Sequence, residues 1–311
     1  MPNELALTVR GGEGALDTFA LRVTRVPVVF VNAYMVGEPG GPWTLVDTGL
    51  PGSAARIRSA AEARFGAGAR PEAIVLTHGH FDHAGNAAEL AAGWDVPIHA
   101  HPLELPYLTG LSDYAPKDPT VGGAIAFLSR FFPTSGYDFG ARARALPEDG
   151  TVPGMPGWQW LHTPGHTAGH IALFRAADRT LLAGDALATM DLDSWMAQAT
   201  RAPEFSLPPT PLTSDWTAAR ASVNRLAALH PRAVGAGHGI PITGGGAAMG
   251  LVSLAASFTP PAHGRYATEP ARADERGVIS VPPAVPDPFP SQVALGAAAL
   301  GMLAIARRRR R

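Results

Sequence analysis

The sequence contains no cysteine among its 311 residues. This absence excludes disulfide bonds and a thiol nucleophile, and it excludes thiolate as a metal ligand. Any metal that the chain binds must therefore be held by oxygen atoms and imidazole nitrogens.

A surplus of positive charge is also missing. The formal net charge is −1, and five of the 25 basic residues form the terminal cluster Arg307–Arg311. Without that cluster the chain carries 20 basic and 26 acidic side chains, so its body is mildly acidic. Such a body gives no general attraction to nucleic acid, and we expect a small-molecule substrate as the partner. Charge and composition leave the oligomeric state open.

Apolar runs long enough to suggest a membrane segment are confined to the C-terminal end. Near the N-terminus, charged side chains such as Arg10 and Asp17 interrupt every apolar run, so no signal peptide is predicted. Residues 291–306 carry no charge and precede the arginine cluster. As a helix they would span about 24 Å, short of the roughly 30 Å hydrocarbon layer. We expect a cytoplasmic protein whose tail is a short membrane anchor or a sorting signal; a tail without fixed structure, or a helix packed on a partner, is the alternative.

Histidine and aspartate are concentrated in one short segment. Residues 77–85 read Thr-His-Gly-His-Phe-Asp-His-Ala-Gly and directly follow the apolar run 73–76. Imidazole nitrogen and carboxylate oxygen are ligands that zinc and similar divalent ions prefer. A turn with a few solvent-facing histidines explains this density poorly. The segment supplies four candidate ligands: His78, His80, Asp82 and His83.

The spacing of these four residues has a structural meaning. The apolar run 73–76 is predicted to be a buried strand, and at its end His78 and His80 point to the same side. The glycine between them lets the backbone pass close to an ion. The other two candidates are predicted to open a helix that runs to about residue 90 and is stopped by Gly93. Two ligands from a strand end and two from a helix start suit a pair of adjacent ions better than one ion.

Three later segments add further candidates. His166 lies in a Thr-Pro-Gly-His-Thr turn, Asp185 in Gly-Asp-Ala and His238 in Gly-His-Gly, each beside a strand-like run. A carboxylate that follows a glycine at a strand end is suited to bridge two ions, with one oxygen for each. His162 and His170, in the same segment as His166, are expected to form supporting hydrogen bonds or to pack rather than to bind metal.

The order His-x-His-x-Asp-His, then a Thr-Pro-Gly-His-Thr histidine, then Gly-Asp, then Gly-His resembles the metallo-β-lactamase superfamily of metal-dependent hydrolases. Val46-Asp47-Thr48-Gly49 is similar to that family's first motif, and the resemblance covers roughly residues 16–245. It implies two divalent metal ions as cofactors, with zinc expected and iron or manganese as alternatives. The family pattern implies these ligands: His78, His80 and His166 for one ion, Asp82, His83 and His238 for the other, and Asp185 as a bridge.

The same resemblance assigns roles to three aspartates. Asp82 and Asp185 are the residues expected to take part in catalysis. Asp47 is expected to support the ligands without binding metal itself.

The resemblance also implies an α/β fold, a four-layer αββα sandwich, which we place over residues 1–260. Within it, the Pro- and Gly-rich stretch 101–156 is predicted to be a lid insert; a hydrophobic cluster packed on the body is the alternative. A Pro-rich extension follows over 261–290, and the apolar segment with its arginine cluster occupies 291–311. Local patterns predict strands at 16–23, 28–36 and 43–46, and helices at 53–65, near 121–131, and at 214–229 with Ser214 or Thr213 as its cap.

The expected activity is that of a binuclear hydrolase, in which a metal-bound hydroxide attacks an ester, thioester or lactone carbonyl. The motifs look like the glyoxalase II and lactonase branches of the family. A lactonase would use an apolar lid, for which residues 107–132 are suited. Glyoxalase II would need a basic pocket, for which five residues are candidates: His263, Arg265, Tyr266, Arg272 and Arg276.

Two other activities stay open. One is an iron-dependent oxidoreductase similar to persulfide dioxygenase, which holds a single ion with two histidines and one aspartate. The intact second ligand set argues mildly against it. The other is β-lactam hydrolysis, although the lack of cysteine excludes the subclass whose second metal uses that residue.

Overall fold

Two β-sheets lie face to face in the structure, a computed structural model that describes residues 16–289. The first sheet has seven strands in the order β1-β2-β3-β4-β5-β6-β7, antiparallel up to β4 and parallel from there on. Its strands are β1 (Asp17–Ala20), β2 (Val23–Val28), β3 (Val31–Gly37), β4 (Trp43–Val46), β5 (Ala73–Val75), β6 (Ile98–Ala100) and β7 (Ala143–Ala145).

The second sheet has five strands in the order β12-β11-β10-β9-β8. Within it β10 and β11 are parallel, and the other neighbours are antiparallel. Its strands are β8 (Trp158–His162), β9 (Ile171–Arg175), β10 (Thr180–Leu182), β11 (Ala233–Gly235) and β12 (Ile242–Thr243).

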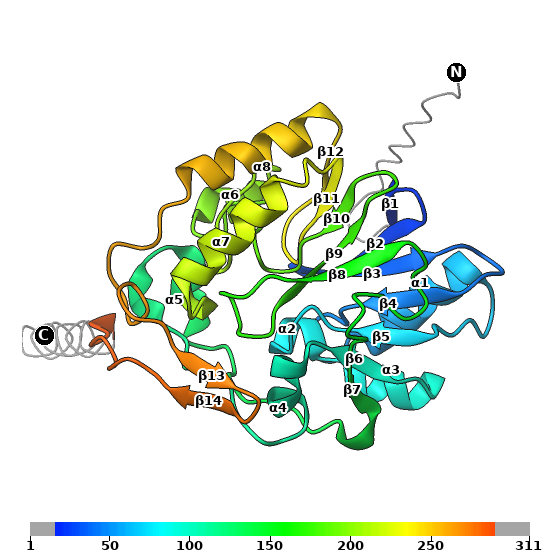
Figure 1. The fold of residues 1–311 in the computed structure, drawn as a ribbon, viewed down its shortest axis with the longest axis horizontal. Helices are drawn as coiled ribbons and strands as arrows, with labels where there is room; N and C mark the ends of the chain where they lie inside the picture. Colours follow the sequence, from blue (N-terminus) through cyan, green and yellow to red (C-terminus); the bar gives the residue numbers. More distant parts are fainter. Residues whose placement is uncertain (1–15, 290–311) are drawn as a thin grey trace, which may run out of the picture.

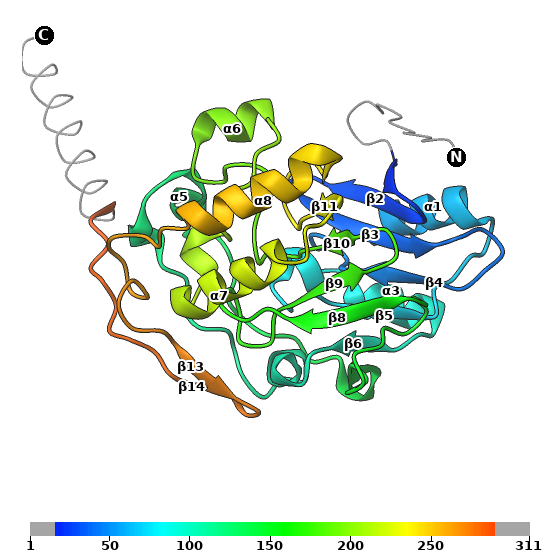
Figure 2. The same cartoon turned by 45° about the horizontal axis from the view of Figure 1, so that its top comes forward.

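Helices cover the outer faces of both sheets (Figure 1, Figure 2). The first sheet packs on α1 (Ala54–Phe65) and α3 (Ala87–Trp94), and the second on α7 (Trp216–Ala227) and α8 (Gly245–Ser257). A third buried cluster, which includes Val36, Val75 and Leu173, fills the space between the sheets. The predicted four-layer αββα sandwich is confirmed.

The predicted N-terminal strands had the wrong bounds. In place of strands at 16–23 and 28–36, three strands are separated by tight turns at Leu21–Arg22 and Val29–Phe30. Arg22 and Val29 adopt positive φ angles of 60° and 59°. Neither turn contains the glycine, proline or asparagine that usually marks such a backbone, so the pattern gave no signal for them.

The helix predicted from Asp82 to about residue 90 is in fact two helices. Helix α2 (Phe81–Ala84) ends before Asn86, whose side-chain amide donates to the carbonyl oxygens of Thr48 and Leu50 at 2.6 Å each. Helix α3 then continues through Gly93 and ends at Trp94, directly before Asp95, which has a left-handed backbone. A long-range hydrogen bond, which no local pattern indicates, therefore sets this boundary.

Helix α7 has a different cap from the predicted one. Asp215, rather than Ser214 or Thr213, accepts a hydrogen bond from the N–H of Ala218 at 2.9 Å. A carboxylate at this position satisfies a free N–H group and suits the positive end of the helix dipole. Thr213 is therefore free to face the site described below.

The stretch 101–156 is only partly an insert. It contains short helices, but its β7 is an edge strand of the first sheet and is followed by Leu146, which is buried between the sheets. Strand β7 reads Ala-Arg-Ala and is largely exposed, so it lacks the apolar signature of a strand. Its helical elements are η1 (Pro102–Glu104), α4 (Leu105–Leu108), η2 (Pro119–Val121), α5 (Ala124–Ser129) and η3 (Gly140–Arg142).

The remaining elements lie toward the C-terminal side. Helix α6 (Trp195–Thr200) and η4 (Thr210–Leu212) connect β10 to α7, and β13 (Arg272–Asp274) pairs with β14 (Gly277–Ser280) as a hairpin. This hairpin lies in the predicted Pro-rich extension and returns to the body, where the N–H of Val278 donates to Ser112 Oγ at 3.2 Å. Between residues 16 and 289, no helix combines the length and the apolar character needed to cross a membrane. The predicted membrane anchor, 291–311, lies outside the described residues.

Candidate metal centre

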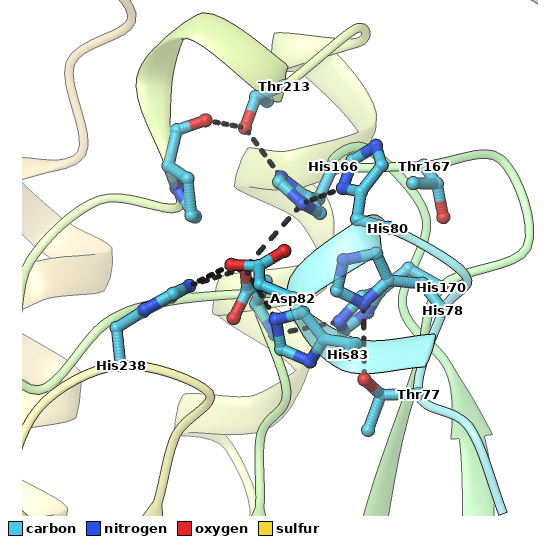
Figure 3. A network of polar contacts seen from close by, with 12 residues as sticks. Thr77, His78, His80, Asp82, His83, His166, Thr167, His170, Thr213 and His238 are labelled. Atoms are coloured by element: carbon cyan, nitrogen blue, oxygen red, sulfur yellow. Dashed lines mark hydrogen bonds and ion pairs between the residues drawn. The ribbon is translucent and has the colours of Figure 1, made fainter. Parts of the chain in front are cut away.

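The loops that follow several strands meet at one edge of the sandwich and bring the predicted ligands together. His78 and His80 follow β5, Asp185 follows β10, and His238 follows β11. The loop between β8 and β9 supplies His166, and helix α2 carries the remaining two ligands. Figure 3 shows the labelled imidazoles turned toward one another and toward Asp82. None of the seven predicted ligands is more than 4% exposed.

The side chains form three groups whose nitrogen and oxygen atoms lie within 4.8 Å of one another. These groups are His78, His80 and His166; His78, His83 and Asp185; and Asp82, His83 and His238. The first and third correspond to the two ligand sets that the family pattern implies. The second group links them through Asp185.

Asp185 lies at the centre of the cluster. Its Oδ2 atom is 3.3 Å from His83 Nε2, 3.2 Å from His238 Nε2 and 3.6 Å from His166 Nε2. His238 Nε2 is also 3.5 Å from Asp82 Oδ2. A single carboxylate therefore lies close to histidines of both predicted ligand sets.

Hydrogen bonds fix the tautomer of two histidines so that Nε2 carries a free lone pair. Asp47 Oδ2 accepts from Nδ1 of His83 at 2.9 Å, and the carbonyl oxygen of Phe30 accepts from Nδ1 of His238 at 3.0 Å. Because an acceptor faces Nδ1 in both cases, the proton resides there. A lone pair on Nε2 that points into the cluster is what a metal ligand requires.

Threonines orient two more histidines in the same way. Thr77 donates its hydroxyl to Asp47 Oδ2 at 2.8 Å, so its oxygen accepts from Nδ1 of His78 at 3.1 Å. Thr213 donates to a backbone carbonyl at 2.9 Å and accepts from Nδ1 of His166 at 3.2 Å. Four of the five imidazoles thus present Nε2, while His80 presents Nδ1, 3.0 Å from His166 Nε2.

Three buried atoms in this cluster have no hydrogen-bond partner among the described residues: His78 Nε2, His83 Nε2 and Asp185 Oδ1. A buried polar atom without a partner costs about 1–3 kcal/mol. Three such atoms in one place, all lone-pair donors, are accounted for if cations bind among them. The residues present therefore fit a metal centre.

Burial keeps most of these imidazoles neutral. It lowers the pKa of His80 to about 3 and holds the pKa values of His78 and His166 well below the usual range. Burial also acts on His83, but the nearby carboxylates of Asp185 and Asp47 outweigh it and raise the pKa of that residue. This shift favours a proton on Nε2 of His83 when no metal is bound; a cation placed among these carboxylates would replace that proton and use the lone pair.

Asp47 supports the cluster from the end of β4. Besides its contact with His83, its Oδ1 accepts the N–H of Thr77 at 2.8 Å and its Oδ2 accepts the Thr77 hydroxyl. The residue is 1% exposed and adopts a left-handed backbone with φ 59°. It fixes the ring of His83 directly and the ring of His78 through Thr77.

We expect Asp47→Asn to weaken metal binding by about 10- to 100-fold, the usual effect of losing a group that orients ligands. An amide offers one acceptor oxygen where the carboxylate offers two, so either the Thr77 N–H loses its acceptor, or the Thr77 hydroxyl and His83 Nδ1 both do. Competition with a chelating dye would measure the affinity. Unchanged affinity would contradict the supporting role.

The other two histidines of the segment that contains His166 lie outside the three groups. His170 Nε2 accepts the backbone N–H of Asp185 at 2.9 Å, so it places the loop of the central carboxylate. His162 donates to the carbonyl oxygen of Ala168 at 2.8 Å and stacks on His101, with ring centroids 4.1 Å apart. Replacement of His170 would leave the Asp185 loop without this hydrogen bond.

One buried acid beside the cluster had no place in the sequence-based prediction. Glu104 is 0% exposed and contacts both ligand loops. The available signal was a single charged residue within the otherwise apolar run 102–108. That signal indicates burial of a carboxylate, but it does not say which groups the carboxylate meets.

A cavity of about 570 Å³ opens beside His80 and His166. Its walls come from the stretch after β6, the start of α7 and the β13–β14 hairpin. Apolar side chains dominate them, including Leu103, Leu212 and Ile279.

Comparison with known proteins tests the family resemblance. The model of the metallo-beta-lactamase superfamily matches residues 26–238. The probable metallo-hydrolase YflN of Bacillus subtilis (strain 168) is 42% identical over 251 residues, which are 80% of this chain and 94% of that protein. A hydroxyacylglutathione hydrolase of Alkalilimnicola ehrlichii is 35% identical over 137 residues, 44% of this chain and 40% of that enzyme.

Among solved structures, a beta-lactamase domain protein from Burkholderia ambifaria superposes with a TM-score of 0.52 at 23% identity, over 79% of this chain and 76% of that chain. This likeness supports the fold. The family match spans every predicted ligand, and the alignment with YflN covers nearly the whole length of that protein. The chain therefore belongs to the metallo-beta-lactamase superfamily and is a metallo-hydrolase.

Proposed function

We propose that the chain hydrolyses ester, thioester or lactone bonds with a two-metal centre. The observation that carries this proposal is the convergence of buried lone pairs around Asp185, described above. His78, His80 and His166 would hold one ion. The second would be held by Asp82, His83 and His238, and Asp185 would contact both.

When bound, ions of this kind would lower the pKa of a water molecule toward about 7 and would polarise the carbonyl group of the substrate. The chain itself contributes charge and orientation. Burial alone would raise the pKa of Asp185, but His238 and His83 beside it hold that pKa well below its usual range. Asp185 therefore stays ionised, as a bridging carboxylate must.

The cavity supports a substrate with an apolar acyl portion. Its lining includes the apolar side chains of Leu103, Val278 and Ile279. Tyr107 and Tyr114 add aromatic surface from the stretch predicted to be a lid. Apolar surfaces of this kind bind acyl chains by removing them from water.

A glutathione thioester is supported less well than an ester or lactone. Of the five residues considered for a basic pocket, Arg272 alone lines this cavity. Tyr266 is buried with its hydroxyl on the carbonyl oxygen of Pro116, and Arg276 pairs with Asp274. One cation offers little for a ligand that carries several carboxylates.

A single-iron oxidoreductase remains the second candidate, since two of the three groups consist of two histidines and one aspartate: His78, His83 and Asp185, and Asp82, His83 and His238. Metal analysis separates the two. Two ions per chain with hydrolysis support the proposal, whereas one iron per chain with oxygen consumption would replace it.

Hydrolysis of a substrate panel tests the proposed activity. The purified, metal-loaded chain would be assayed with acyl-homoserine lactones of several chain lengths, simple acyl esters, S-lactoylglutathione, a cephalosporin and a phosphodiester. We expect the highest kcat/KM on lactones or esters, rising with acyl length until the cavity is filled. Turnover of the phosphodiester or cephalosporin alone would contradict the proposal.

A further inference from the structure

The carboxylate of Glu104 lies between the two loops that carry the ligands of the first metal set. Glu104 ends the short helix η1, which follows β6. One ligand loop contains His78, Gly79 and His80, and the other contains His166 and Gly169. None of the hydrogen bonds that this carboxylate accepts comes from a charged side chain.

Four donors surround the carboxylate, two on each oxygen. Oε1 accepts from the hydroxyl of Thr167 at 2.6 Å and from the N–H of Gly169 at 3.0 Å. Oε2 accepts from the N–H of Gly79 at 3.1 Å and from the hydroxyl of Tyr114 at 2.5 Å. One oxygen thus holds the loop of His166, and the other holds the loop of His78 and His80.

The glycines of both ligand loops allow this close approach. A Cβ atom on Gly169 would lie 2.7 Å from the backbone nitrogen of Glu104 and 2.8 Å from its Cγ. A Cβ atom on Gly79 would lie 2.4 Å from the Tyr114 hydroxyl. Gly79 was expected to let the backbone pass near an ion; in the structure its missing side chain also leaves room for Tyr114.

Tyr114 extends the contact to a ligand ring. It accepts the N–H of Gly79 at 2.8 Å, and its ring centroid is 4.5 Å from that of His80. Its hydroxyl is therefore fully engaged, as the donor to Glu104 and the acceptor from Gly79. Tyr114 therefore connects Glu104 to the ring of His80.

We propose that Glu104 is a positioning residue that sets the distance between the His78–His80 loop and the His166 loop, and thereby the affinity of the first metal set. This inference rests on the two-metal function proposed above. The second set, Asp82, His83 and His238, forms no hydrogen bond to Glu104 and should be affected less.

Glu104→Gln tests this role with almost no change of shape. The amide nitrogen takes the place of one carboxylate oxygen and cannot accept the two hydrogen bonds that this oxygen accepted. One of the two ligand loops therefore loses its acceptor. After equilibration in zinc buffers, we expect the variant to bind one ion as the wild type does and the other about 10- to 100-fold more weakly. Activity should return when zinc is raised, with KM for substrate little changed.

Asp118→Asn is the matched control. Asp118 is also a buried carboxylate with several donors, the N–H and hydroxyl of Thr120 and the N–H of Arg265, but it contacts neither ligand loop. We expect it to lower stability while leaving both zinc affinities at the wild-type values. If both variants weaken zinc binding equally, the effect of Glu104 is general destabilisation and the proposal is wrong.

Two milder variants decide the matter if Glu104→Gln fails to fold. Tyr114→Phe and Thr167→Val each remove one of the four donors, and both should weaken the same ion in the same direction. The proposal is wrong if Glu104→Gln keeps the wild-type zinc affinity. It is also wrong if Tyr114→Phe and Thr167→Val both keep it. A wild-type chain that binds no metal in this titration would refute the proposed function itself, so the two failures are distinguishable.

Discussion

Asp185→Ala is expected to release at least one metal ion and to reduce hydrolysis by about 10³-fold. The stabilisation that metal ions give to a transition state is worth several kcal/mol, and each 1.36 kcal/mol is tenfold in rate. Asp185 contacts histidines of both ligand sets through one oxygen atom, and its other oxygen has no partner among residues 16–289. Without this carboxylate, two dications would repel each other with little negative charge between them.

The measurement is metal content per chain together with turnover, compared with His238→Ala. His238 belongs to one of the three ligand groups. Asp185 belongs to another, and its Oδ2 atom also lies close to His166 and His238, which belong to the remaining two groups. Loss of the His238 side chain should reduce hydrolysis less than loss of Asp185, and excess zinc should restore part of the lost activity. An Asp185→Ala chain that keeps two ions and turns over at nearly the wild-type rate would refute the bridged two-metal arrangement.

The residues that meet in the candidate metal centre could be predicted from the sequence because each motif is local. A strand end, a glycine and a ligand occur together in the chain, and parallel strands bring their carboxyl ends to one edge of a sheet. Strand Trp43–Val46 was likewise predicted with the bounds that the structure has, since it is a short apolar run between turn residues. Patterns of this kind need no knowledge of distant contacts.

The surroundings of the ligands could not be predicted in this way. Glu104 meets Thr167 and Gly169 across more than sixty positions of the chain. The β13–β14 hairpin that walls the cavity comes from a stretch read only as Pro-rich, and the edge strand β7 has no apolar pattern. These features depend on which segments the fold places side by side, so composition and periodicity do not reveal them.

Gly237→Ala is expected to disrupt the metal centre without altering any ligand. A Cβ atom at this position would lie 2.0 Å from Asp185 Oδ1 and 2.6 Å from His83 Cε1. The backbone cannot move aside easily, because the Gly237 N–H donates to the carbonyl oxygen of Gly184 and its own carbonyl accepts the N–H of Asn32, both at 2.8 Å. The central carboxylate must therefore turn away from the histidines.

We expect the added methyl group of Gly237→Ala to cost about 1–3 kcal/mol of stability through overpacking, and the displaced carboxylate to cost at least one bound ion. Gly245→Ala is the matched control, since a Cβ atom there meets no atom within 4 Å and the residue begins helix α8. Alanine is favoured over glycine in a helix by up to about 1 kcal/mol, so the control should be as stable as the wild type or more so. Thermal unfolding and metal content of both variants give the comparison. If Gly237→Ala retains two ions and normal turnover, Asp185 does not have to occupy its central position for the centre to form.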